Sequence, residues 1–150
     1  MAFLQGTSTV DITGLKDAIL NYKDGVVHTD CPEDSTTVAT LDALAAEIKN
    51  TYESSTGKTI TRTSTWRHCH EKGIGVNKHY DTVPVCGCFF LSAPTGSGKM
   101  KFYPEGEATI EYDIEEGKYL VWDDGSDHSV DEHQSDESRI MITFNFDLSS

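Results

Sequence analysis

Two histidines and an aspartate in this chain have the residue types and the spacing to hold a metal ion. His79 and Asp81 are separated by one residue, and residues two apart in an extended strand point to the same face. A second histidine, His128, lies between strand-like runs further along the chain. Two imidazoles and one carboxylate on one side of a metal leave coordination positions open for reactants, a ligand set that suits non-haem Fe(II). We therefore predict that His79, Asp81 and His128 are the metal ligands.

Other histidines compete for this role. His68 and His70 also have the same-face spacing of a strand, but neither is followed by a carboxylate two residues later. His28 and His133 lie in polar segments, and both are predicted to be surface residues. His68 and His70 are therefore the second choice for a metal site.

The cysteines offer a zinc site as a further alternative. Cys86 and Cys88 share one face of a predicted strand, and Cys69 or His70 could complete a set of zinc ligands. No two cysteines have the C-x-x-C spacing that supports such a site, so Cys86 and Cys88 are predicted to be small buried thiols. All four cysteines of the chain are expected to be reduced.

Residues 93–100 are similar to the phosphate-binding loop of ATPases, but they end in the wrong residue. The last position requires a serine or threonine to hold Mg²⁺, and here it is Met100. Such a loop must also open a helix, whereas residues 99–104 have a strand-like composition. We predict a tight hairpin turn without nucleotide binding. Residues 123–127 lack the spacing of a calcium loop and are predicted to be a solvated acidic turn.

Charge and hydropathy disfavour several classes of partner. The chain has 150 residues and a formal net charge of −13, which argues against binding to nucleic acid or to an anionic membrane. No apolar run approaches the roughly 20 residues of a membrane span. Residues 1–9 lack the basic and apolar segments of a secretion signal. A cytoplasmic location is the default expectation, and the oligomeric state is not indicated.

The hydrophobic pattern changes from helical to strand-like in the middle of the chain. Apolar residues at helical spacing predict a helix over residues 10–24, ending at Gly25, and a second helix from Val38 to Tyr52 that closes at Gly57. After Gly57 the pattern alternates and is rich in β-branched residues, as in strands. Strands are predicted near residues 58–66, 74–80, 84–92, 99–103, 107–113, 118–123 and 139–147.

This order of elements predicts a single α+β domain that is mainly β. Residues 1–57 are expected to form a helical support, and residues 58–150 an all-β core such as a jelly roll or a cupin-like barrel. No repeat, low-complexity tract or linker divides the chain.

Residues 66–147 resemble the 2-oxoglutarate- and Fe(II)-dependent dioxygenases, particularly the prolyl 4-hydroxylase branch. That family has H-x-D on an early strand, then a distal histidine and a basic residue, which correspond here to His79 with Asp81, to His128 and to Arg139. Further segments look like the oxygen-sensing prolyl hydroxylases: residues 102–106, 113–115, 121–130 and the closing strand 139–147. The resemblance implies a double-stranded β-helix, which is a jelly roll, with the two N-terminal helices packed against one sheet.

The resemblance also implies the chemistry. The triad would hold Fe(II), 2-oxoglutarate would occupy two open positions, and O₂ would take the third, with ascorbate in support. Arg139 would pair with the far carboxylate of 2-oxoglutarate. Succinate and CO₂ would be released as an unactivated C–H is hydroxylated, in a peptidyl proline or in a small molecule.

The closing strand is expected to contribute more of the pocket. Met141, Thr143 and Asn145 share the face of Arg139 in an extended strand, so they are predicted to line the same pocket, with Thr143 among the co-substrate contacts. A family tyrosine that often holds the tail of 2-oxoglutarate has no counterpart in residues 89–92.

Two other classes of function remain open from the sequence. The first is a cupin-type metalloenzyme that does not use 2-oxoglutarate, which a measurement of succinate production would distinguish. The second is a binding module on the same barrel without catalysis, which a lack of iron binding would favour.

Overall fold

The computed structural model describes residues 3–22, 30–123, 125 and 127–149 and is mostly β-structure. Its elements follow in the order β1 Phe3–Thr7, α1 Leu15–Asn21, α2 Ser35–Thr56, β2 Ile60–His70, β3 Val76–His79, β4 Val85–Ser92, β5 Lys99–Tyr103, β6 Ile110–Asp113, β7 Lys118–Trp122, β8 Asp127–Val130 and β9 Arg139–Leu148. The prediction of a mainly β chain with two N-terminal helices is therefore confirmed for the described residues.

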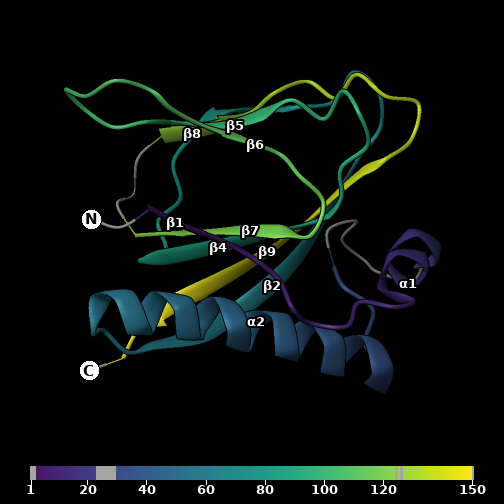
Figure 1. Ribbon diagram of the computed structural model, residues 1–150, viewed down its shortest axis with the longest axis horizontal. Helices are drawn as coiled ribbons and strands as arrows, with labels where there is room; N and C mark the ends of the chain where they lie inside the picture. Colours follow the sequence, from purple (N-terminus) through teal and green to yellow (C-terminus); the bar gives the residue numbers. More distant parts are fainter. Residues whose placement is uncertain (1–2, 23–29, 124, 126, 150) are drawn as a thin grey trace.

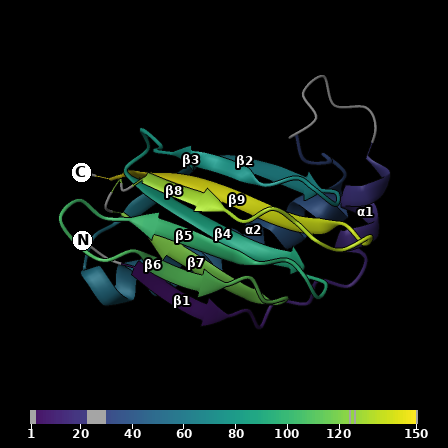
Figure 2. The same ribbon diagram turned by 90° about the horizontal axis from the view of Figure 1, so that it is seen from above.

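The strands form two antiparallel sheets that lie one above the other (Figure 1). One sheet has five strands in the order β1-β7-β4-β9-β2, and the other has four in the order β3-β8-β5-β6. From β2 to β5 and again from β6 to β9, successive strands alternate between the two sheets. Figure 2, seen from above, shows the four-stranded sheet lying over the five-stranded one. Residues distant in sequence therefore meet between the sheets.

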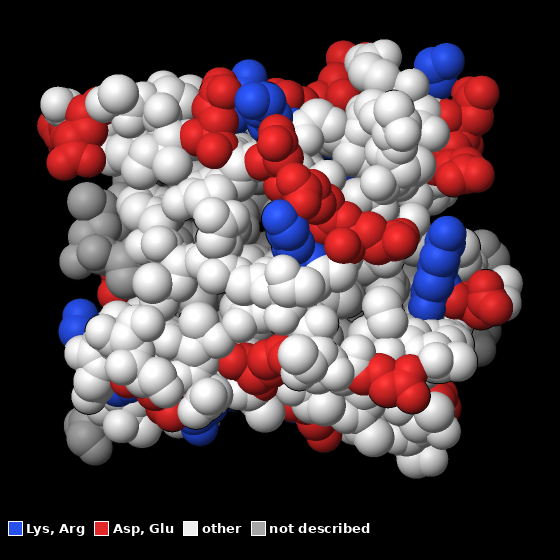
Figure 3. All heavy atoms as spheres, viewed as in Figure 1, with Lys and Arg blue, Asp and Glu red and all other residues white. Residues whose placement is uncertain are grey.

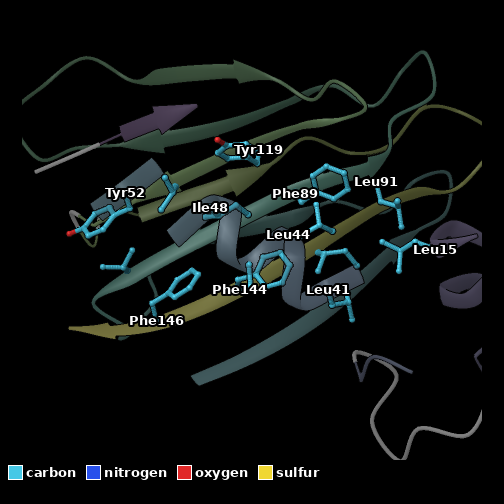
Figure 4. Packing of buried hydrophobic residues seen from close by; sticks show 14 of the residues in the cluster. Leu15, Leu41, Leu44, Ile48, Tyr52, Phe89, Leu91, Tyr119, Phe144 and Phe146 are labelled. Atoms are coloured by element: carbon cyan, nitrogen blue, oxygen red, sulfur yellow. The ribbon is translucent and has the colours of Figure 1, made fainter. Parts of the chain in front are cut away.

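Helix α2 covers the outer face of the five-stranded sheet (Figures 1 and 4). Its buried side chains include Leu44, Ile48 and Tyr52, which pack in one cluster with Phe144 and Phe146 of β9. Alternating residues of β9 point to the opposite side of the sheet, because side chains in a strand point alternately to its two faces. The helix thus supports the strand whose other face meets the second sheet.

A glycine lets this helix lie close to the sheet. A Cβ atom added at Gly87 of β4 would lie 2.8 Å from Cγ2 of Ile48. Asp34 caps the start of helix α2, because its side chain accepts a hydrogen bond from the Thr37 amide, and Gly57, with φ +73°, caps its end. Both are common capping arrangements for a helix, and the predicted end at Gly57 is confirmed.

Three local predictions need correction. Helix α1 is shorter than the predicted helix over residues 10–24, because it begins only after Gly14, and Gly25 lies outside the described residues. Strands β1 and β8 were not predicted; β1 pairs with β7 and so extends the sheet at its edge. Residues 93–98 connect β4 to β5, which lie in different sheets, so they form a crossover turn and not a hairpin.

Among the charged side chains on the face shown in Figure 3, acidic ones are more frequent than lysines and arginines. Some lysines are paired, such as Lys101 with Asp131 at 3.2 Å and Lys99 with Glu111 at 3.5 Å. Such partly exposed ion pairs contribute little to stability. Neither helix among the described residues is long and apolar enough to cross a membrane.

Candidate metal centre

The three predicted metal ligands lie together at one end of the space between the sheets. His79 at the end of β3 is directly opposite His128 in β8, and their rings are 4.4 Å apart between centroids. Asp81 lies just after β3, with its carboxylate 3.1 Å from Nε2 of His128 and 3.7 Å from Nε2 of His79. One donor atom from each residue lies within 4.8 Å of the others. The pairing of β3 with β8 therefore adds His128 to the two residues that the H-x-D spacing already places together.

Each imidazole is held in a defined orientation. Nδ1 of His79 lies 2.7 Å from the carbonyl oxygen of Asn77, so it donates its proton there and leaves the lone pair of Nε2 for a metal. His128 is buried and packs against the rings of Phe102 and Trp122, whose centroids lie 5.6 and 5.5 Å from that of its own ring. The exposed His79 and the buried His128 thus present their Nε2 atoms to the same carboxylate.

The carboxylate of Asp81 is kept ionised. The hydrogen bond with His128 is the main cause that holds the pKa of Asp81 below its ordinary value, against the opposing effect of burial. The thiol of Cys86 lies 3.8 Å from Asp81 Oδ2 and 3.3 Å from Oδ1 of Asn145. Burial raises the pKa of Cys86, so it remains a thiol and can donate to either oxygen. Asn145 is itself held by a hydrogen bond of 2.9 Å to Ser64.

This donor set fits Fe(II). Two imidazole nitrogens and one carboxylate oxygen are the donors of the facial ligand set of non-haem iron oxygenases, which leaves further positions for reactants. Among the described residues, no other group of three histidine, cysteine or acidic side chains comes close enough to hold a metal. Neither the second-choice site at His68 and His70 nor the zinc alternative at the cysteines is therefore formed.

A cavity of about 280 Å³ opens beside the triad, between the two sheets. It is near the lower end of the volumes of ligand pockets, about 300–1,000 Å³, and so suits a small molecule. The lining is shared by both sheets and includes the triad, His68 and His70 of β2, and Met141, Thr143 and Asn145 of β9. The prediction that Met141, Thr143 and Asn145 share one pocket is confirmed.

Arg139 is not among the lining residues, although it starts the same strand. Its side chain is fully buried and makes five hydrogen bonds to protein atoms. Nε and Nη2 donate to Nδ1 of His70 at 3.1 and 2.8 Å, and the other acceptors are the carbonyl oxygens of Ser97, Asp131 and Ile74. These carbonyls belong to three different connections between strands. Arg139 therefore joins the loops at this end of the sandwich, and its direct contact with a co-substrate remains a prediction.

Several residues lie where the sequence did not indicate. His133 is completely buried and was wrongly predicted to be at the surface, because its polar segment folds against residues 73 and 74 through backbone hydrogen bonds. His28 lies outside the described residues. Cys86 and Cys88 are buried thiols, as predicted.

Two contacts beside the site were not predicted from the sequence. Cys86 approaches Asp81, and His70 accepts from Arg139. The only signal was the position of each on the inward face of its strand. The pairing of β2 with β9, which sets His70 opposite Arg139, cannot be read from either segment alone.

The fold of this chain is similar to that of several solved structures, although its sequence matches no family model and no curated protein. A 2OG-Fe(II) oxygenase family oxidoreductase from Burkholderia pseudomallei matches with TM-score 0.76 and 13% identity, over 97% of this chain and 84% of that one. A prolyl-4-hydroxylase from Pseudomonas putida matches with TM-score 0.73 and 12% identity, over 99% and 88%.

A third structure is a prolyl hydroxylase from Trichoplax adhaerens in complex with a peptide fragment of the hypoxia inducible factor oxygen degradation domain. It matches with TM-score 0.70 and 17% identity, over 96% of this chain and 82% of that one. At these identities the likeness shows the fold. The predicted resemblance to 2-oxoglutarate- and Fe(II)-dependent dioxygenases, prolyl hydroxylases included, is therefore confirmed at that level.

Proposed function

We propose that this protein is an Fe(II)- and 2-oxoglutarate-dependent dioxygenase that hydroxylates an unactivated C–H bond. The observation that carries this proposal is the convergence of His79, Asp81 and His128, with their donor atoms within 4.8 Å of one another. The double-stranded β-helix predicted from the sequence is the form of jelly roll that we assign to the two sheets, in keeping with their strand order. The fold alone would not support an activity, because one fold serves many functions.

The residues of the chain divide the work. His79, Asp81 and His128 would hold Fe(II), which when bound supplies the oxidative decarboxylation of 2-oxoglutarate and the activation of O₂. The Asn77 carbonyl fixes the tautomer of His79, and Asp81 stays charged through His128. Val76, Met100 and Val130 of the four-stranded sheet, which also carries His79 and His128, add apolar walls to the cavity. Such walls restrict water around the reacting groups.

The positive charge of Arg139 favours an anionic ligand in this cavity. Burial lowers the pKa of Arg139 to about 10, so the guanidinium is still charged at neutral pH. Its five hydrogen bonds go to an imidazole nitrogen and to carbonyl oxygens, which leave the charge without neutralisation by direct bonding. A dicarboxylate such as 2-oxoglutarate would compensate this charge, and Thr143 offers a hydroxyl on the wall of the same cavity.

We propose a peptide or protein substrate, with a peptidyl proline as the leading candidate, and a cytoplasmic location. The support for the substrate is the likeness to prolyl hydroxylases, one of which was solved with a peptide. Tyr80 lies between two metal ligands in sequence and is 65% exposed, so an aromatic surface is available beside the metal centre. A small-molecule substrate is the alternative for the same reaction.

The experiment is turnover with Fe(II), 2-oxoglutarate and ascorbate, followed by mass spectrometry for added oxygen and by a succinate assay. Wild-type protein should form succinate, and Asp81→Ala or His128→Ala should abolish both succinate formation and anaerobic iron binding. His68→Ala is the matched control, because it removes a cavity histidine that is not a metal ligand, and it should still bind iron. Succinate formation that persists in Asp81→Ala would contradict the proposal, and iron binding without succinate formation would favour a cupin-type enzyme.

A further inference from the structure

The guanidinium of Arg139 has no N–H group left for a ligand. A guanidinium has five N–H donors and no acceptor, and Arg139 makes five hydrogen bonds to protein atoms. The side chain is completely buried and does not line the cavity. A ligand in the cavity would therefore have to displace a protein acceptor in order to bond Arg139 directly.

His70 stands between Arg139 and the cavity. It lines the cavity, and its Nδ1 atom receives hydrogen bonds from Nε and Nη2 of Arg139. A nitrogen that accepts must carry a lone pair, so in the neutral ring the proton is on Nε2. Burial, with help from the charge of Arg139, lowers the pKa of His70 to about 4, so the ring is neutral at physiological pH.

The free N–H of His70 is available to the cavity. Nε2 of His70 has no hydrogen-bond partner among the described residues. It is also absent from the fully buried polar atoms without a partner, so this nitrogen is accessible. The remaining access of this ring is thus toward the space that it lines. His68, on the same face of β2, has its ring 6.2 Å from that of His70.

We propose that His70, through Nε2–H, is the residue that hydrogen-bonds the far carboxylate of 2-oxoglutarate, and that Arg139 is a positioning residue that acts through it. Arg139 fixes the tautomer of His70 and places a positive charge one side chain behind the anion. This inference rests on the proposed use of 2-oxoglutarate.

The test compares two ligands that differ at the far end. 2-Oxopentanoate has a methyl group where 2-oxoglutarate has its far carboxylate. Calorimetry with the Zn(II)-loaded protein gives the ratio of the two dissociation constants without turnover. In His70→Asn the amide oxygen can still accept from Arg139, but no N–H reaches the position of Nε2. A hydrogen bond to a charged group is worth about tenfold or more in affinity. We therefore expect the dissociation constant of 2-oxopentanoate divided by that of 2-oxoglutarate to fall by about that factor in His70→Asn.

His68→Asn is the matched control, since it shortens the neighbouring cavity histidine in the same way and should leave the ratio unchanged. Nitrogen-detected NMR of wild-type protein should show the Nε2–H resonance of His70 shift with 2-oxoglutarate and not with 2-oxopentanoate. An unchanged ratio in His70→Asn, with 2-oxoglutarate still bound tightly, would overturn the role of His70 and leave the proposed function intact. Wild-type protein that does not prefer 2-oxoglutarate would overturn the proposed function itself.

Discussion

The buried His70 should make the protein less stable in acid. The pKa of His70 is lowered from 6.5 to about 4, first by burial and then by the charge of Arg139 with smaller effects from His68 and His133. Between these two pH values the unfolded chain binds a proton at His70 that the folded protein does not bind. The free energy of unfolding therefore falls as the pH decreases from about 6.5 toward 4.

The magnitude follows from the difference between the two pKa values. One pKa unit corresponds to about 1.36 kcal/mol. Protonation of His70 in the unfolded chain therefore lowers the free energy of unfolding by about 3 kcal/mol by pH 4. His70 is only 6% exposed, but its ring lines the cavity, so solvent there screens the charge and about 3 kcal/mol is an upper value. The neutral ring therefore makes its full contribution to the free energy of unfolding above pH 6.5, and most of that contribution is lost by pH 4.

The assay is urea unfolding of metal-free protein at several pH values, for wild type and His70→Asn. All other ionisable groups are the same in both proteins, so the difference between the two curves isolates His70. The variant should lose about 3 kcal/mol less than wild type between pH 6.5 and 4. Parallel curves would refute the reasoning, because they would mean that His70 is protonated as readily in the folded protein as in the unfolded chain.

Three further predictions concern other parts of the molecule. Arg139→Lys should lower the free energy of unfolding by about 2 kcal/mol or more, because an ammonium has three donors for acceptors that now receive five hydrogen bonds; an unchanged urea midpoint would argue against this network. Gly87→Ala should cost about 1–3 kcal/mol, since the new Cβ would lie 2.8 Å from Ile48, and a thermal melt checks it. Calorimetry with ATP and Mg²⁺ should detect no binding at the loop before Met100; micromolar affinity that is lost in Lys99→Ala would contradict this.

The sequence by itself indicated the candidate metal ligands, whose donor atoms the fold brings within 4.8 Å of one another, and most of the strands. The alternation of side chains in a strand is a local property, so the spacing of His79 and Asp81 already placed them on one side. The same rule placed Met141, Thr143 and Asn145 on one face of β9, where they line the cavity. Helix α2 was equally readable, because its apolar stripe and its end at Gly57 are local signals.

Only the tertiary structure decided what Arg139 and His133 contact. The sequence placed Arg139 on the inward face of its strand, but its hydrogen-bond acceptors come from three loops and from His70 of a different strand. The position of His133 depended likewise on a loop that folds against residues 73 and 74. Strand periodicity fixes the direction of a side chain, whereas its partners depend on which distant segments the two sheets bring together. A buried guanidinium must satisfy its donors with the acceptors that the fold brings near it, and the pairing of β2 with β9 places His70 among them.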